Sequence, residues 1–357
     1  MAAPVFHTLT VSDVTAETDE SVAVTFAVPP DLAAEFSYLP GQHVTVRAVI
    51  GGEDVRRSYS ICANANTGTL RVGIKALPGG AFSTWATTAL EPGVTLEVMP
   101  PIGEFTITPD PARARHYGAI VAGSGITPVL SLVSTVLDTE PDSRFTVVFG
   151  NRRAGSIMFL DELEGLKNRH PGRLHLIHVL SRESGIVPLL TGRIDAAKLE
   201  ALFDLLIEVD TVDGWFLCGP FEMVTTARMV LVARGVPGDV IRDELFFAGP
   251  VDPTLLPPPP DDVEGSVELG FILEGRRSTV RMLPETSVLD AALSVRNELP
   301  FSCKGGMCAS CKARLVEGTV EMAKNYALVD ADLKAGYVLT CQSHPTSDRV
   351  VVDYDQR

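Results

Sequence analysis

Several features that mark membrane or secreted proteins are missing from this sequence. No run of 18 apolar residues occurs in the 357-residue chain, so no transmembrane helix is expected. The first nine residues lack a basic region followed by an apolar stretch, so a secretory signal is not expected and a cytoplasmic location is predicted. Basic residues are few, because 30 Lys and Arg accompany 45 Asp and Glu. The net charge of −15 disfavours nucleic acid and anionic membranes as partners.

Cysteine is scarce, but its distribution is informative. The chain has six cysteines, and four of them form a set with three members inside nine residues: Cys303, Cys308, Cys311 and Cys341. In a chain without a secretory signal, such clustering indicates metal binding and not disulfides. Cys62 and Cys218 lie outside the set, and Cys62 is predicted to be a small buried apolar residue.

The first 249 residues divide into two patterns. In residues 1–112, apolar residues alternate with small or polar ones and Pro-Gly or Gly-Gly turns recur, which predicts an antiparallel β-barrel. In residues 113–249, short apolar runs alternate with helical patterns, which predicts a doubly wound parallel sheet. The expected strands are 118–122, 145–149, 174–180 and 215–218, and the expected helices are 128–137, 159–167 and 221–234.

A proline-rich segment at residues 250–264 contains four consecutive prolines and is predicted to be a stiff, solvated linker. It separates a third domain at residues 265–357. With about 90 residues, this domain is small enough for a bound metal centre to contribute to its stability.

The cysteine spacing C-x4-C-x2-C, with Cys341 further along, is the pattern of plant-type [2Fe–2S] ligation. Four thiolates must converge on two irons, so three come from one tight loop and one from a distant segment. Gly305 and Gly306 permit positive φ and let backbone N–H groups face the cluster sulfurs. A zinc site is the alternative, but zinc sites usually use two C-x2-C pairs and this loop has only one.

A glycine-containing loop at residues 123–128 follows an expected strand and begins an expected helix, which suits a pyrophosphate at Gly123, Gly125 and Thr127. The loop is not G-x-G-x-x-G, and a simple tight turn is the alternative. The next two strands end at Arg152 and at Ser181-Arg182. Arginines there suit a 2′-phosphate, which favours NADPH, although NADH remains open and the arginines could be ordinary surface residues.

Two short segments of the first domain suit a flavin. In Arg57-Ser58-Tyr59-Ser60, arginine can pair with phosphate, tyrosine can lie against a flat ring and serine can hydrogen-bond a ring nitrogen. Gly80 and Ser83 lie at a glycine turn that leads into a helix N-terminus. Each signal is weak by itself. A flavin is nevertheless chemically required, because nicotinamide gives two electrons at once and a [2Fe–2S] cluster takes one at a time.

These motifs together resemble the ferredoxin–NADP reductase-like flavoproteins that are fused to a C-terminal plant-type ferredoxin and serve as reductase components of bacterial oxygenases. Residues 57–60 and 80–83 are similar to the family's flavin motifs, and residues 123–128 and Cys218-Gly219-Pro220 to its nicotinamide motifs. The resemblance implies FAD, a β-grasp fold for residues 265–357, and Ser60 and Cys218 next to the reacting atoms. The family's Glu-Arg-Phe segment is Glu244-Leu245-Phe246 here, so Phe246 is expected near the flavin ring.

The resemblance also implies a separate, di-iron, multisubunit oxygenase as partner. Segments 150–159, 179–183, 325–328 and 339–345 are most similar to reductases that serve phenylacetyl-CoA epoxidation. Reductases of 3-ketosteroid 9α-hydroxylation or of another ring-hydroxylating oxygenase are the alternative. Two other interpretations stay open: a non-catalytic redox sensor, and a flavin reductase with a structural zinc domain.

Overall fold

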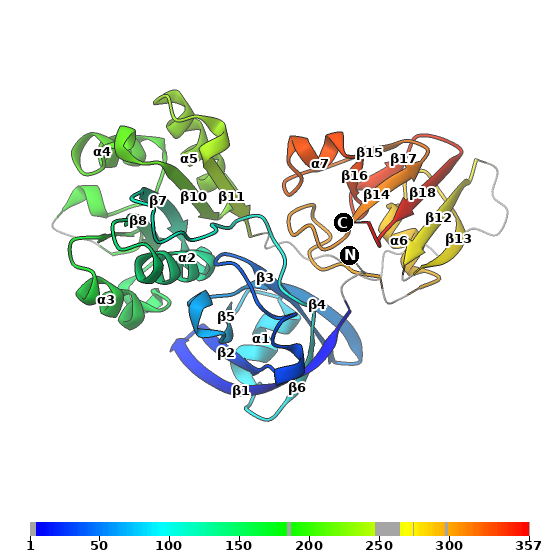
Figure 1. Cartoon of the computed structure of the whole chain (residues 1–357), viewed down its shortest axis with the longest axis horizontal. Coiled ribbons are helices and arrows are strands. Elements are labelled where there is room, and N and C mark those ends of the chain that lie inside the picture. Colours follow the sequence, from blue (N-terminus) through cyan, green and yellow to red (C-terminus); the bar gives the residue numbers. More distant parts are fainter. Residues whose placement is uncertain (1–4, 184–186, 247–264, 274, 297–298, 357) are drawn as a thin grey trace.

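The computed structural model describes residues 5–183, 187–246, 265–273, 275–296 and 299–356, and these form three units (Figure 1). We call them the barrel unit (β1–β6), the parallel-sheet unit (β7–β11) and the C-terminal unit (β12–β18). The linker predicted at residues 250–264 lies outside the described residues. Among the described helices, none has the length and apolar character needed to cross a membrane.

The barrel unit is a six-stranded antiparallel sheet in the order β4-β3-β6-β1-β2-β5, as the sequence predicts. An isolated antiparallel bridge between Ile61, which follows β4, and Val72 in β5 brings the two edges together. The strands are β1 (His7–Thr18), β2 (Ser21–Ala27), β3 (His43–Ile50), β4 (Glu53–Ser60), β5 (Leu70–Lys75) and β6 (Thr95–Val98), and helix α1 spans Ala81–Thr88. Alternate apolar residues such as Val22, Val24 and Phe26 fill the interior.

The parallel-sheet unit has the strand order β11-β10-β7-β8-β9, with every pair parallel. Its strands are β7 (His116–Ala122), β8 (Arg144–Asn151), β9 (Leu174–Leu180), β10 (Gly214–Gly219) and β11 (Ile241–Leu245). Its helices are α2 (Ile126–Thr139), α3 (Leu160–Arg169), α4 (Ala196–Leu205) and α5 (Phe221–Ala233). All expected strands and helices are found, and the doubly wound sheet is confirmed; α4 and β11 were not predicted.

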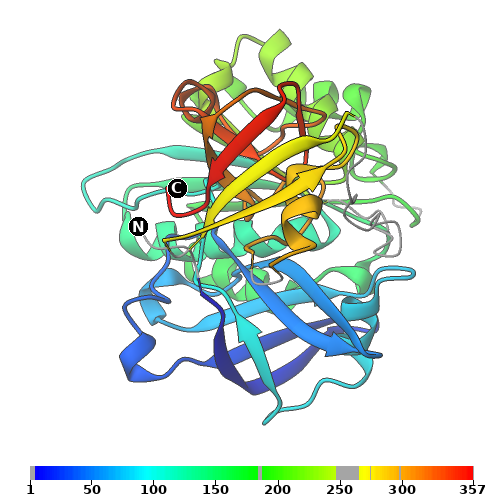
Figure 2. The same cartoon turned by 90° about the vertical axis from the view of Figure 1, so that its right-hand side faces the viewer.

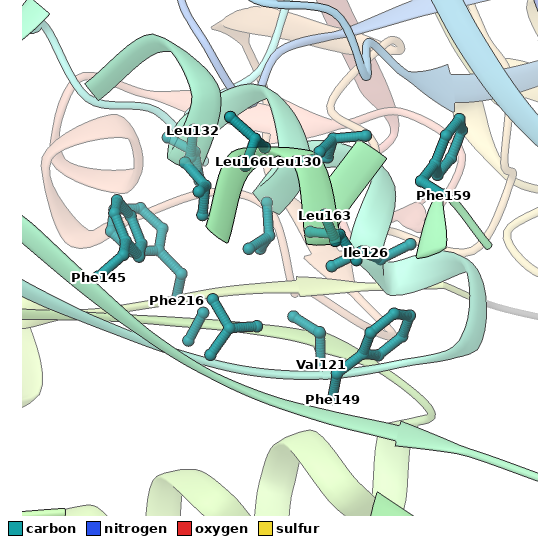
Figure 3. Packing of buried hydrophobic residues seen from close by; sticks show 14 of the residues in the cluster. Val121, Ile126, Leu130, Leu132, Phe145, Phe149, Phe159, Leu163, Leu166 and Phe216 are labelled. Carbon is teal, nitrogen blue, oxygen red and sulfur yellow. The ribbon is translucent and has the colours of Figure 1, made fainter. Parts of the chain in front are cut away.

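One apolar core joins the parallel-sheet unit to the barrel unit. Helices α2 and α3 pack on one face of the parallel sheet, where Phe145, Phe149 and Phe216 meet Leu130 and Leu166 (Figure 3). The same core continues into the barrel side of the molecule through Ala23, Cys62, Phe105 and Ile107. Cys62 is fully buried there, as predicted. Helices α4 and α5 cover the other face of the sheet with a second core.

The C-terminal unit is a mixed five-stranded sheet in the order β13-β12-β18-β14-β16, which lies beside the other two units in Figure 1 and faces the viewer in Figure 2. Strands β12 and β18 are parallel and the other pairs are antiparallel, and α6 packs on the sheet, which fits the expected β-grasp. Its strands are β12 (Val267–Leu273), β13 (Arg276–Met282), β14 (Lys312–Glu317), β15 (Val320–Met322), β16 (Tyr337–Leu339), β17 (Ser343–Pro345) and β18 (Arg349–Asp353). Its helices are α6 (Val288–Leu293) and α7 (Asp330–Lys334).

Gly41, in the turn before β3, provides a test of how the barrel unit meets the parallel-sheet unit. Its φ is +94°, and a Cβ atom there would lie 2.0 Å from the backbone oxygen of Phe105 and 3.5 Å from Leu132 of α2. Gly93 has the same φ of +94° with nothing within 4 Å. Backbone strain alone costs about 1–3 kcal/mol, and the collision at Gly41 adds about 1–3 kcal/mol.

We therefore expect Gly41→Ala to lower the midpoint of thermal unfolding further than Gly93→Ala, by about 2–4 °C for each additional kcal/mol. Differential scanning calorimetry of the two variants measures this difference. Equal shifts would mean that the close approach of Phe105 to Gly41 does not constrain the fold.

Candidate functional site

The loops at residues 123–128 and 218–220 lie side by side at the carboxyl edge of the parallel sheet. The winding of the chain reverses between β7 and β10, which is where open parallel sheets bind ligands. A 3-10 turn at Gly123–Gly125 leads into α2, and no side chain caps this helix. A Cβ atom at Gly125 would lie 2.3 Å from the carbonyl oxygen of Cys218, so only glycine allows the two loops to approach so closely.

The α2 loop also contacts the barrel unit. Thr127 is 1% exposed, and its hydroxyl donates to the carbonyl oxygen of Ser124 (3.0 Å). Its Cγ2 atom lies 2.6 Å from the position that a Cβ atom would take on Gly73 of β5. The predicted nucleotide loop is therefore held directly against a strand of the predicted flavin domain.

Cys218, Gly219 and Pro220 connect β10 to α5. Cys218 is fully buried, and burial together with the nearby Glu244 carboxylate raises the pKa of its thiol well above the ordinary value. The Cys218 thiol therefore stays protonated, so it can line a binding site as a neutral, weakly polar group. Gly219 has φ +153°, and Pro220 is the N-cap of α5, so the chain turns sharply away from the sheet here.

The two predicted arginines are neighbours at the same edge. The backbone N–H of Ser181 donates to the carbonyl oxygen of Asn151 (2.9 Å) and that of Arg182 to the carbonyl oxygen of Arg152 (2.8 Å), which continues the pairing of β8 with β9. Both arginines are exposed, and Lys75 of β5 lies close enough to Arg152 for their charges to interact. Beside them the Asn151 amide is 7% exposed, and neither of its polar atoms has a partner among the described residues. A cationic edge with an unsatisfied buried amide fits a phosphorylated nucleotide.

The predicted flavin residues lie on the barrel unit facing these loops. Arg57 of β4 is exposed and Tyr59 is half-buried, with its ring 5.4 Å from that of Phe82 in α1. Gly80 is the N-cap of α1 without a side-chain cap. The Ser83 hydroxyl accepts from the N–H of Leu77 (3.1 Å) and donates to Gly80 O (3.3 Å), which fixes the turn before the helix. An exposed cation, an aromatic ring and an uncapped helix start suit a dinucleotide flavin.

The Glu244 carboxylate connects the two predicted sites. The Ser60 hydroxyl donates to Glu244 Oε2 (3.2 Å), and Glu244 pairs in register with Cys218 on the neighbouring strand. Glu244 Oε1 lies 3.6 Å from Nδ1 of His43, which is 4% exposed. Burial lowers the pKa of His43, but the hydrogen bond and charge of Glu244 outweigh this, so the pKa is raised. The two predicted catalytic residues thus meet through one carboxylate.

The four cysteines of the predicted cluster converge next to this carboxylate. Cys303, Cys308 and Cys311 lie in the loop before β14, and Cys341 follows β16. Thr340 ties the two segments together, because its hydroxyl donates to the carbonyl oxygen of Cys311 (2.9 Å). Cys308 is near enough to His43 for their charges to interact. The cysteine loop therefore faces the Ser60–Glu244 pair.

Backbone N–H groups in the loop point at sulfur. Those of Gly305 and Met307 donate to Cys303 Sγ (3.3 and 3.5 Å), and that of Cys303 donates to Cys308 Sγ (3.5 Å). The expectation of positive φ at both glycines is met only at Gly306 (φ +79°). The other positive φ values belong to Lys304 (+49°) and Ala309 (+52°), so the loop reaches its geometry partly through strained non-glycine residues.

The sulfurs associate in two pairs. Cys303 shares a hydrogen bond with Cys308, and Cys311 shares one with Cys341, so within each pair one pKa is lowered and the other raised. Among the described residues, no group of three His, Cys, Asp or Glu side chains could hold a single metal ion. Zinc needs four ligands around one ion, whereas each iron of a [2Fe–2S] cluster takes two protein ligands. The two pairs of thiols therefore fit a [2Fe–2S] cluster.

The sequence motifs did not predict two residues of this centre. Glu244 entered the prediction only as part of the segment that contains Phe246, although its position at the end of a strand could have indicated a functional residue. His43 gave no signal, because a single histidine on a strand is usually structural. Phe246 is partly buried and packs against the core shared by the barrel and parallel-sheet units, and its contact with a flavin stays a prediction.

Three family models match the chain in the order of the three units. Residues 8–107 match the oxidoreductase FAD-binding domain, residues 119–229 match the oxidoreductase NAD-binding domain, and residues 271–346 match the 2Fe-2S iron-sulfur cluster binding domain. These matches show that the chain contains FAD-binding, NAD-binding and [2Fe–2S] cluster-binding domains.

Curated relatives cover nearly the whole chain. It is 42% identical over 362 residues to one of the subunits of the 1,2-phenylacetyl-CoA epoxidase of Escherichia coli (strain K12), covering 99% of this chain and 98% of that protein. It is 30% identical over 353 residues to the 3-ketosteroid-9-alpha-monooxygenase, ferredoxin reductase component, of Rhodococcus rhodochrous, covering 97% and 96%.

Among solved structures, phthalate dioxygenase reductase has the same architecture, with a TM-score of 0.60, 20% identity and 98% coverage of each chain. This likeness supports the fold, and the relatives above carry the family assignment. The chain belongs to the ferredoxin–NADP reductase-like flavoproteins that are fused to a plant-type [2Fe–2S] ferredoxin, and it is an NAD(P)H-dependent flavin and iron–sulfur oxidoreductase.

Proposed function

We propose that this chain is the reductase component of a multicomponent oxygenase, taking electrons from NADPH and delivering them to a separate oxygenase component. The observation that carries the proposal is the meeting of three sites at Glu244. The carboxylate accepts from Ser60 of the flavin motif, lies beside Cys218 of the nicotinamide motif, and reaches through His43 to the loop of Cys308.

Bound FAD would supply a hydride acceptor for nicotinamide that can release electrons singly, and a bound [2Fe–2S] cluster would supply a one-electron carrier. The residues of this chain position the bound groups relative to one another. Gly125 lets the nicotinamide loops close on each other, and Thr127 sets them against β5. Ser60 and Cys218 present one hydroxyl and one protonated thiol to the reacting atoms. Beside them, Nδ1 of buried His43 and Oε1 of partly buried Glu244 lie 3.6 Å apart.

The oxygenase that we propose as partner is the di-iron, multisubunit enzyme of phenylacetyl-CoA epoxidation. Identity of 42% over almost the full length supports this choice, compared with 30% for the 3-ketosteroid system. We further propose the domain boundaries 1–112, 113–249 and 265–357, with 250–264 as the linker, and a cytoplasmic location, where reduced nicotinamide is available.

We expect reduction of the phenylacetyl-CoA oxygenase component to exceed that of a 3-ketosteroid oxygenase component. Both purified components are supplied separately to the reductase with NADPH, and product formation coupled to NADPH consumption is measured. Preference for the steroid component would contradict the pathway assignment but not the electron-transfer role.

Cys308→Ala removes one cluster ligand. We expect transfer to the oxygenase to fall at least a hundredfold, while NADPH–ferricyanide turnover, which needs only the flavin and nicotinamide sites, is largely kept. Cys62→Ala, at a buried cysteine outside the set, is the control and should retain both activities. Loss of both activities together in a folded Cys308→Ala protein with full FAD content would contradict the modular scheme. Slow NADPH oxidation in the unaltered protein would favour a redox sensor.

Arg152 and Arg182 are proposed to bind the 2′-phosphate of NADPH. Charge-assisted hydrogen bonds are worth about 1.5–3 kcal/mol, so Arg182→Ala should lower kcat/KM for NADPH about tenfold or more and leave that for NADH nearly unchanged. Arg152→Ala should behave in the same way. Arg153→Ala is the control, since this exposed neighbour follows the strand end. Parallel losses with both nucleotides would refute the assignment.

A further inference from the structure

The β3–β4 hairpin of the barrel unit has a polar face that meets the C-terminal unit. The strands are antiparallel, and alternate residues point to the same side. The polar residues on this face stand opposite one another as three cross-strand pairs: His43–Ser60, Thr45–Ser58 and Arg47–Arg56. The intervening residues Arg57 and Tyr59, which are two of the four residues of the flavin motif, point to the other side.

Side chains on this face contact the segment at residues 299–311, which carries three of the four cluster cysteines. The Ser58 hydroxyl donates to the Ser302 hydroxyl (2.8 Å), and those of Thr45 and Ser310 lie 3.3 Å apart. A hydroxyl can exchange such a partner for water at little net cost in free energy. These two contacts therefore add little to the stability of the interface, but they define how the two units fit together.

Arg56 makes the strongest contacts on the face. It is 3% exposed, although arginine is rarely so deeply buried. Its Nη1 donates to the carbonyl oxygen of Leu299 (2.9 Å), and its guanidinium lies 4.5 Å from the ring centre of Phe301. On the barrel side, Nη2 pairs with Asp54 (2.9 Å). One charged group thus bridges a carboxylate of one unit and a carbonyl and an aromatic ring of the other.

The position of these contacts matters for electron transfer. Phe301 precedes Cys303 by two residues, so holding residues 299–301 fixes the start of the cysteine loop. Arg56 contacts the cluster-bearing unit, and the next residue of β4, Arg57, is predicted to bind the flavin. A shift at Arg56 would therefore change the separation between the two.

We propose that Arg56 is a positioning residue that holds the C-terminal unit against the barrel unit, with the cluster loop next to the flavin site. The inference rests on the proposed function and extends it to the interface between units. Separation of the units would remove the Leu299 acceptor and the Phe301 ring from Arg56 at the same time, so the docked state is favoured.

Arg47 offers a matched control. It is the cross-strand partner of Arg56, stacks on the same Phe6 ring (4.4 Å, against 5.3 Å for Arg56) and pairs with Glu97 in its own unit. Both of these contacts lie within the barrel unit. Replacing either arginine with methionine removes one charge from the same hairpin, but only Arg56→Met removes the contacts with Leu299 and Phe301.

The test combines two measurements on the loaded, full-length protein. Hydrogen–deuterium exchange of peptides covering residues 299–311 should become about tenfold faster or more in Arg56→Met and change little in Arg47→Met. In single-turnover stopped-flow with NADPH, reduction of the cluster should slow at least tenfold in Arg56→Met, while flavin reduction keeps its rate. Phe301→Leu, which alters the contact from the other side, should reproduce both effects.

Unchanged exchange or an unchanged rate of cluster reduction in Arg56→Met overturns the proposal, as do equal effects in Arg47→Met. If Arg56→Met does not fold, Phe301→Leu decides by the same two measurements. Failure of the proposed function is distinct: it would appear as no NADPH-dependent cluster reduction in the unaltered protein, whereas exchange of residues 299–311 reports docking without turnover.

Discussion

The Glu244 carboxylate is the point on which the arrangement of the three units depends. It comes from the last strand of the parallel sheet, accepts a hydrogen bond from Ser60 of the barrel, and lies beside His43, which in turn approaches the cysteine loop. A buried carboxylate is costly unless polar partners surround it. Both partners, Ser60 and His43, come from the barrel, so this partly buried carboxylate is satisfied only when the parallel sheet and the barrel are assembled, and His43 extends the arrangement to the cysteine loop.

Much of the fold could be predicted because the deciding signals are local. Alternation in the first hundred residues gives the antiparallel strands, and apolar runs that end in glycine give the strand-to-helix loops of the parallel sheet. The cysteine spacing predicts its own loop and its ligand type. Helix α4 was missed because it follows a segment with few periodic signals, and β11 because a five-residue edge strand with charged residues is not distinctive.

The centre of the site was less predictable, because its members meet only in the folded chain. His43 and Glu244 are about 200 residues apart, and neither lies in a motif that specifies the other. The positive φ of Lys304 and Ala309 has the same origin, since the demands of the cysteine loop outweigh the preference of these residues for negative φ. Tertiary constraints of this kind produce no periodic pattern in a sequence.

The shared apolar core has a consequence for how the molecule comes apart. Cys62 and Phe105, on the barrel side, pack in the same cluster as helix α2, so the first two units share apolar packing although the barrel also has an interior of its own, and we expect the shared cluster to couple their melting. The C-terminal unit has its own interior, built from residues 267–354, and meets the barrel mainly through polar groups and the parallel-sheet unit through Met307 and the Phe221–Tyr326 pair. Such a seam lets a ferredoxin be gained, lost or exchanged over evolutionary time without exposing the interior of the reductase.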